Sequence, residues 1–210
     1  MVLAAGMSTR MGFPKALIRV QGELLLCKVV KQALRSDLDM VVTVIGQDRG
    51  PIADALTPFV SDSRFRLAVN PTPERGMSSS MIVGLDSITP EPPGIMIILG
   101  DQPGVTAEVI DRLSAAWSAA PLLIVHPTVR GRRTTPVVFP NRYFGELRSV
   151  TGDKGGREVL ERHADETIAV EMASCYDDDD IDTPEDAERL LGRAGFTTVE
   201  LPPGGTDDPP

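Results

Sequence analysis

Residues 3–15 read L-A-A-G-M-S-T-R-M-G-F-P-K, and we expect the rest of the chain to be organised around this stretch. It begins as an apolar run typical of the end of a buried strand and then changes to small residues, two glycines and two cations. Gly6 can adopt backbone angles closed to other residues, and small neighbours let amide N–H groups approach phosphate oxygens. Arg10 and Lys15 add full positive charges. The stretch therefore predicts a phosphate-binding loop directly after the first strand.

This loop matches neither of the two commonest phosphate motifs. It has neither the glycine spacing of a dinucleotide-binding fingerprint nor the Gly-Lys-Ser/Thr ending of a P-loop, so ordinary dehydrogenases and NTPases are disfavoured. The pattern L-A-A-G-x-S-x-R-M-G-x-P-K resembles the nucleotide-binding loop of nucleotidyltransferases that act on sugar phosphates and on molybdopterin, and most of all the MobA-like branch with its molybdenum cofactor cytidylyltransferases. The resemblance implies catalytic roles for Arg10 and Lys15. It implies nucleotide contacts from Leu3, Ala4, Ala5, Gly6, Ser8, Arg10 and Lys15.

Composition limits the classes of protein that fit. The chain has 210 residues, which suits one domain with a full core, and we place that domain at residues 1–196. Residues 197–210 are rich in Pro, Gly and Asp and are expected to be a disordered tail. The net charge of −9 argues against nucleic-acid binding. No apolar run is long enough to span a membrane and no leader is visible, so we expect a cytoplasmic protein.

Strands and helices alternate along the chain, which predicts an α/β fold: a single-domain, Rossmann-like, three-layer α/β/α sandwich around a mostly parallel sheet. The first strand has little chain before it, so either it is short or the natural start lies earlier. Valine- and isoleucine-rich runs without polar alternation indicate strands buried on both faces. The expected strands are 40–45, 66–69, 94–99, 122–125, 136–139 and 167–170, and the main expected helices are 22–34, 52–59, 81–88, 106–119 and 183–194.

A second glycine-containing segment runs from Asn70 to Leu85. The serines of G-M-S-S-S, residues 76–80, precede an apolar helix and are expected to cap its free N–H groups, where the helix dipole also favours an anion. A plain helix cap is the alternative interpretation. N-P followed by G-M-S-S-S is similar to a signature of the MobA-like branch, which implies nucleotide-side roles for Asn70, Ser78 and Ser79.

Two aspartates are candidate metal ligands. Asp101 follows the strongest strand, and ligands of open parallel sheets bind at the carboxyl ends of strands. The run L-G-D-Q-P around Asp101 resembles the magnesium-binding motif of the family, which implies a catalytic and metal-binding role for Asp101. The phrase D-I-D-T-P-E-D resembles the family's closing motif, which implies that Asp182 completes the Mg²⁺ site. The other acidic residues of 177–179 are interpreted as an exposed turn.

The acceptor side is expected between residues 130 and 157. Thr134-Thr135-Pro136 stands where the family usually has G-H-P or G-N-P, so the acceptor's identity is left open, although nearby arginines favour a phosphorylated one. The run G-D-K-G-G-R resembles the family's G-D-x-G-A-R element and predicts a second anion site at a helix start. The two histidines are expected to be structural or surface residues. The acceptor-binding residues implied are Arg133, Thr135, Asp153, Gly155 and Arg157.

The resemblance implies a Mg²⁺-dependent transfer of a nucleoside monophosphate to a phosphorylated acceptor, molybdopterin above all, with release of pyrophosphate. Ala5 resembles the cytidylyl branch, so CTP is favoured over GTP. A molybdenum hydroxylase or its accessory proteins are candidate partners. Alternatives are a non-catalytic accessory protein that hands the cofactor to such a hydroxylase, a guanylyl or sugar-phosphate transferase, and a small oxidoreductase. Intact Lys15, Asp101 and Asp182 argue against the accessory protein and the oxidoreductase, since neither needs a triphosphate site.

Overall fold

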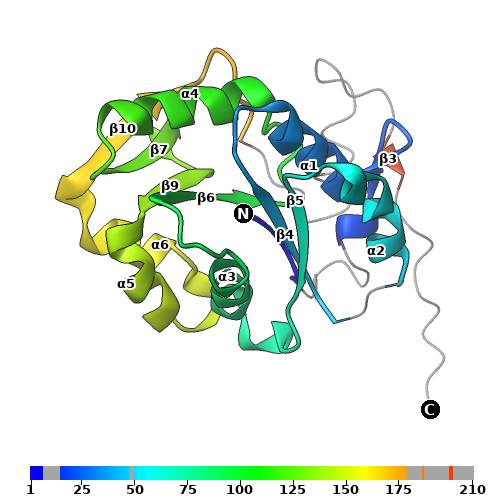
Figure 1. The fold of residues 1–210 in the computed structure, drawn as a ribbon. Helices are drawn as coiled ribbons and strands as arrows, with labels where there is room; N and C mark the ends of the chain where they lie inside the picture. Colours follow the sequence, from blue (N-terminus) through cyan, green and yellow to red (C-terminus); the bar gives the residue numbers. More distant parts are fainter. Residues whose placement is uncertain (7–14, 48–49, 179–185, 187–198, 201–210) are drawn as a thin grey trace.

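The computed structural model describes residues 1–6, 15–47, 50–178, 186 and 199–200, and they form one α/β domain around a central sheet (Figure 1). The strand order is β10-β7-β9-β6-β1-β4-β5, with β8 attached to β7. Neighbours are parallel except where β9 and β8 pair. The strands are β1 (Val2–Ala4), β4 (Val41–Ile45), β5 (Phe65–Val69), β6 (Gly94–Leu99), β7 (Ile124–Val129), β8 (Arg132–Arg133), β9 (Val137–Pro140) and β10 (Thr167–Glu171).

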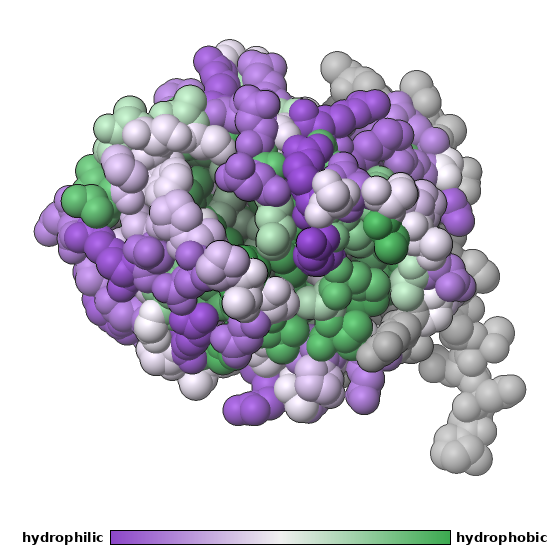
Figure 2. Space-filling view, in the orientation of Figure 1, coloured by the Kyte–Doolittle hydropathy of each residue, from purple (hydrophilic) through white to green (hydrophobic). Residues whose placement is uncertain are grey.

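Helices cover both faces of this sheet, which confirms the predicted three-layer sandwich (Figure 1). One face carries α1 (Leu25–Arg35), α2 (Gly50–Leu56) and α4 (Ala107–Ala119). The other carries α3 (Met77–Asp86), α5 (Phe144–Ser149) and α6 (Arg157–Arg162). In the view of Figure 2, hydrophilic residues predominate around the periphery and hydrophobic residues gather towards the centre.

Strand β6 shows why the sequence folds in this way. Met96 and Ile98 pack into the core under α1 and α4, whereas Ile95 and Ile97 pack into the core under α3, α5 and α6. Successive side chains of a strand point to opposite faces, so a strand buried on both faces needs a continuous apolar run. Because β1 and β6 are parallel neighbours, their carboxyl ends lie at one edge of the sheet, where polar residues follow.

Strand β9 runs antiparallel to β7 because the connection between them is short. Residues 130–136 separate it from β7, whereas a parallel crossover needs about a dozen residues or more. The chain therefore turns back, through β8, and enters the sheet in the opposite direction.

The first predicted helix begins later than expected. Gln21 and Gly22 have positive φ angles of 58° and 75° and form a two-residue turn between β2 (Arg19–Val20) and β3 (Glu23–Leu24). Such a turn matches the twist of an antiparallel pair, so the hairpin takes the residues before Leu25 out of the helix. Part of the predicted tail, Val199–Glu200, forms β11, which pairs with β2. The predicted helix at 183–194 and the rest of the tail lie almost wholly outside the described residues.

In the part of the chain that the structure describes, no helix combines the length and the apolar character needed to cross a bilayer. Both cysteines, Cys27 and Cys175, are free thiols.

Candidate functional site

The carboxyl ends of β1 and β6 bring two predicted motifs together. The amide of Gly100 donates to the carbonyl of Leu3 at 2.9 Å, and a Cβ added to Gly100 would lie 3.0 Å from the Cβ of Ala4. Gly100 therefore lets the L-A-A-G strand approach the start of the Asp101 loop closely. Ala5 is buried and Gly6 is exposed at the end of β1.

Lys15 and Asp101 form an ion pair at this edge. Lys15 begins the short 3-10 turn η1 (Lys15–Leu17), and its Nζ donates to Oδ2 of Asp101 at 3.2 Å. The side chains are 18% and 27% exposed, so both charges remain accessible to a ligand. A cation and a carboxylate from positions 86 residues apart thus meet where the strands end.

Three predicted site residues, Ser8, Arg10 and Asp182, lie outside the described residues. The acidic segment that leads to Asp182 is described as far as Asp178, and it passes the Asp101 loop: a Cβ added to Gly104 would lie 2.0 Å from the carbonyl oxygen of Asp177. No group of three His, Cys, Asp or Glu residues that could hold a metal occurs within the described residues. The shared Mg²⁺ site therefore stays a prediction.

Asn70 is a structural link at the start of α3. It is fully buried, and its Nδ2 donates to the Oγ atoms of Ser79 at 2.8 Å and Ser80 at 2.9 Å, while its Oδ1 accepts from the amide of Thr72. The amide hydrogens of Asn70 are thereby used within the protein. The nucleotide contacts predicted for Asn70, Ser78 and Ser79 stay predictions, and Asn70 and Ser79 would make them only by exchanging these bonds.

The prediction that serines cap α3 is wrong. The helix begins at Met77, its N-cap is Gly76, and the serines lie within its first turn, with Ser78 buried. The amide of Met77 donates instead to Oδ1 of Asp153 at 3.2 Å. A carboxylate from a distant loop therefore supplies the negative charge that the start of a helix favours.

Glycines make this contact possible. Gly76 has φ 89° and ψ −177°, angles that only glycine adopts readily. A Cβ there would lie 2.6 Å from Oδ1 of Asp153, and a Cβ on Gly155 would lie 2.7 Å from Sδ of Met77. The G-M-S-S-S and G-D-K-G-G-R motifs thus interlock as one structural unit, through α3 and the 3-10 turn η5 (Gly152–Lys154).

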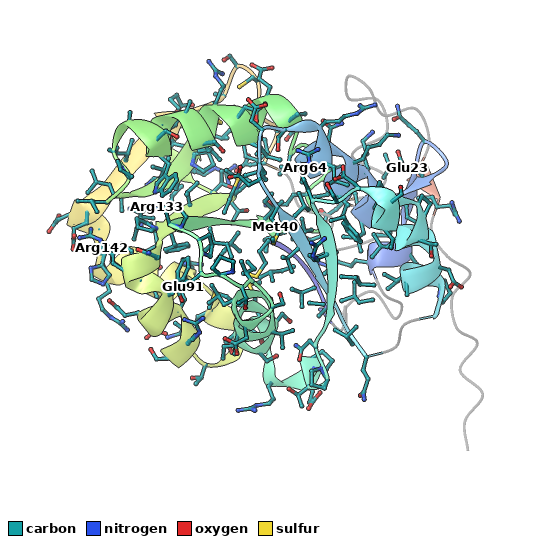
Figure 3. All side chains as sticks on the ribbon, viewed as in Figure 1. Glu23, Met40, Arg64, Glu91, Arg133 and Arg142 are labelled. Atoms are coloured by element: carbon teal, nitrogen blue, oxygen red, sulfur yellow. The ribbon has the colours of Figure 1, made fainter. Side chains whose placement is uncertain are left out.

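A pocket of about 820 Å³ opens against the same face of the sheet. Four of the five predicted acceptor-binding residues line it, namely Arg133, Thr135, Asp153 and Arg157, and Gly155 adjoins it through its contact with Met77. Figure 3 shows Arg133 on the side of the molecule formed by β7, β9 and α6. The pocket reaches the carboxyl end of β6 at Leu99 and Gln102, on either side of Asp101.

Thr135 is fixed in this pocket. Its Oγ1 donates to Oε1 of the buried Gln102 at 2.7 Å, and its carbonyl accepts from the hydroxyl of Tyr176 at 2.7 Å. The threonine that departs from the family pattern therefore connects this pocket to the Asp101 loop.

The arginines of the predicted basic loop point to different surroundings. Arg133 lines the pocket, whereas Arg132 is exposed and pairs with Asp178 at 3.6 Å. Arg157 lines the pocket while its Nε donates to Oε1 of Glu161 at 2.8 Å. Helix α6 has only six residues, so its start alone makes a weaker anion site than the sequence suggested.

The sequence interpretation missed several pocket residues, among them Met77, Gln102, His126 and Lys154. His126 is 2% exposed on β7, and its Nδ1 lies 3.1 Å from the carbonyl oxygen of Pro127. Burial lowers the pKa of His126, the Arg133 charge lowers that pKa further, and the hydrogen bond to Pro127 opposes them. The polar residues at 126 and 128 in I-V-H-P-T-V were the available signal, because alternate strand residues share a face.

Comparison with known proteins agrees with this architecture. Residues 1–167 match the model of the MobA-like NTP transferase domain. The purine catabolism protein PucB of Bacillus subtilis is 31% identical over 195 residues, which cover 90% of this chain and 93% of PucB. A bifunctional protein GlmU of Sorangium cellulosum is 30% identical over 179 residues, but the match covers only 36% of GlmU.

Solved structures show the same fold. Rv0371c of Mycobacterium tuberculosis superposes with a TM-score of 0.76 at 27% identity, covering 90% of this chain and 95% of that one. A nucleotidyl transferase of Methanothermobacter thermautotroptrophicus, at 19% identity, superposes with a TM-score of 0.74 and covers 90% of this chain and 93% of its own. With the family model spanning most of the chain, this protein belongs to the family of MobA-like NTP transferase domains, which are nucleotidyltransferases.

Proposed function

We propose that this protein transfers a nucleoside monophosphate, CMP from CTP, to the terminal phosphate of a molybdopterin-type acceptor and releases pyrophosphate. The observation that carries the proposal is the accessible Lys15–Asp101 ion pair at the ends of β1 and β6, next to a pocket with cationic walls. A triphosphate needs a cation and a metal-binding carboxylate at one point, and an anionic acceptor needs cations beside it.

On the nucleotide side, the amide groups around Gly6 would hold phosphate oxygens, and Lys15 would neutralise charge on the departing pyrophosphate. Asp101 fits a Mg²⁺ ligand, because its carboxylate is accessible and Mg²⁺ takes one or two carboxylates with phosphate and water in its other positions. Asp182 is the proposed second carboxylate. When bound, Mg²⁺ would supply charge neutralisation across the triphosphate. Rv0371c, a relative at 26% identity, was solved in complex with manganese, which supports a divalent ion.

On the acceptor side, Arg133, Lys154 and Arg157 would orient the phosphate of the acceptor. A phosphate oxygen is already ionised near neutral pH, so the reaction needs positioning more than a general base. Apolar side chains such as Ile97 and Phe139 line the same pocket and would pack against the body of the acceptor. The preference for CTP rests on Ala5 and its likeness to the cytidylyl branch. The product would then serve a molybdenum hydroxylase.

The proposal is tested by pyrophosphate release with CTP, GTP, ATP and UTP, each with molybdopterin, with its molybdenum-loaded form and without acceptor, at fixed Mg²⁺. We expect release with CTP only when an acceptor is present. Tight binding of molybdopterin without pyrophosphate release from any nucleotide would favour the accessory protein instead. Pyrophosphate release with a hexose 1-phosphate but not with molybdopterin would mean that the acceptor is a sugar phosphate. The assignment as a nucleotidyltransferase would then stand.

A further inference from the structure

His126 is the polar member of an otherwise apolar row across the sheet. Ala169 pairs with His126 in the parallel register of β10 and β7. The antiparallel register of β7 and β9 sets Val137 on its other side, and Ile97 pairs with Val137 in turn. All four residues line the pocket. An aliphatic side chain would fill this position at no electrostatic cost, so the imidazole needs an explanation beyond packing.

The hydrogen bond of His126 fixes what its ring offers. Nδ1 lies 3.1 Å from the carbonyl oxygen of Pro127, and a carbonyl oxygen can only accept. The proton is therefore placed on Nδ1, and Nε2 carries a lone pair. Within the described residues, no hydrogen bond of the ring other than that of Nδ1 is present.

The charges nearby favour the neutral ring. Burial disfavours the imidazolium, and so does the positive charge of Arg133 on the adjoining hairpin strand. Asp153 and Glu161 line other parts of the pocket but are not among the groups that act on the ring. A neutral imidazole with a bonded Nδ1–H accepts a hydrogen bond and does not attract an anion.

We infer that Nε2 of His126 accepts a hydrogen bond from an N–H or O–H group on the body of the acceptor, and that it selects acceptors carrying such a donor at this point. The cationic side chains of the pocket bind the phosphate of the acceptor, and His126 contacts an uncharged part of the same molecule. The inference rests on the proposed function and extends it to the acceptor's chemistry: a polar heterocycle or polyol, not a purely apolar alcohol phosphate.

Steady-state kinetics with CTP, Mg²⁺ and molybdopterin test this inference through the KM for molybdopterin. His126→Phe keeps a planar ring without the acceptor atom, and we expect the KM for molybdopterin to rise about tenfold, the effect of losing one hydrogen bond to a buried group. The KM for CTP should not change. His126→Gln restores an acceptor oxygen and should recover most of the loss, and His163→Gln, at a histidine outside the pocket, is the matched control. An unchanged KM in a folded His126→Phe would overturn the inference.

A second measurement does not depend on turnover. The chain contains two histidines, so [15N]histidine labelling gives two ring systems, assigned by the variants. We expect His126 to show a protonated Nδ1 and an unprotonated Nε2 at pH 7, and its Nε2 signal to shift on saturation with molybdopterin while His163 does not. An Nε2–H tautomer, or no shift at saturation, contradicts the inference. If the wild type binds molybdopterin but releases no pyrophosphate, the proposed function fails while the Nε2 shift still decides this inference.

Discussion

Two regions of the molecule adjoin each other but are assembled differently: the proposed nucleotide side, at the ends of β1 and β6, and the proposed acceptor pocket, against β7, β9 and α6. The described part of the first region comes from two motifs, each continuous in sequence: one spans residues 3–15 and ends in Lys15, and the other ends in Asp101. The pocket takes side chains from stretches between Met77 and Ala169. Two hydrogen bonds hold the stretches around the pocket together: Thr135 to Gln102 beside Asp101, and the amide of Met77 to Asp153. Substitutions in the two regions should therefore affect different kinetic quantities.

The largest expected effect is the loss of turnover in Asp101→Asn, on the proposed nucleotide side. We expect turnover to fall about a thousandfold or more with little change in the midpoint of thermal unfolding, because the carboxylate is the proposed Mg²⁺ ligand and is not needed for packing. Asp86→Asn, at an exposed aspartate that pairs with Arg148 at 3.1 Å, is the control and should be fully active. Pyrophosphate release measures both. Near-normal turnover of Asp101→Asn would reject its metal role.

Gly76→Ala should disrupt the contact between the start of α3 and Asp153. The new Cβ would lie 2.6 Å from both Asp153 Oδ1 and the carbonyl carbon of Gly152, at φ 89°. We expect the free energy of unfolding to fall by about 2 kcal/mol or more, from strain and overpacking together. Urea denaturation measures the loss. Gly145→Ala, on the exposed face of α5 with no atom within 4 Å, should be neutral or slightly stabilising.

A milder change tests whether the pocket acts on acceptor binding alone. Arg133→Gln should raise the KM for the phosphorylated acceptor by about tenfold, because one charge-assisted hydrogen bond is lost, and should leave the KM for CTP unchanged. Arg142→Gln is the matched control: Figure 3 shows Arg142 near α5, and it pairs with Glu166 at 2.6 Å outside the pocket. An equal rise in both KM values would mean that the two regions are not separate.

The smallest expected effect is on the pH dependence of stability. The pKa of His126 lies below 6.5 in the folded protein, so the unfolded chain binds the extra proton first and stability falls as the pH drops through about 6.5. Hydrogen bonds, from Arg162 to Glu146 and from His163 to Glu166, lower the pKa of these carboxyl groups below 4.5, outside this window. Urea denaturation at pH 7.5 and 5.5 should show a smaller loss for His126→Phe than for the wild type. Equal losses would contradict the pKa shift.

The sequence predicted the strands and helices that can be identified from residues adjacent in the chain. The runs 40–45 and 94–99 identified buried strands because strands covered on both faces need uninterrupted apolar residues. The helix expected at 106–119 does form, with Thr106 as its N-cap, whose hydroxyl accepts from the amide of Val109. The rule that ligands bind at the carboxyl ends of parallel strands predicted the place of Asp101 after β6, and the structure sets Lys15 beside it.

The serine cap failed for a physical reason. Ser78 and Ser79 have the composition of a cap, but the charge at that helix start comes from Asp153, 76 residues further on. A local pattern cannot show that a distant carboxylate has already satisfied an amide. The hairpin at Gln21 and Gly22 is a different kind of miss, because β2 and β3 are neighbours in sequence and the turn between them is local.

The sequence by itself determined the sandwich, the positions of its core strands along the chain and the presence of the motifs, because each depends on residues that follow one another. Only the tertiary structure decided that His126 lines the pocket with its Nδ1 hydrogen-bonded, that Thr135 bonds to Gln102, and that Gly76 packs against Asp153. These features depend on which face of a strand a residue occupies and on which distant group arrives to pair with it. Strand register and loop closure set both.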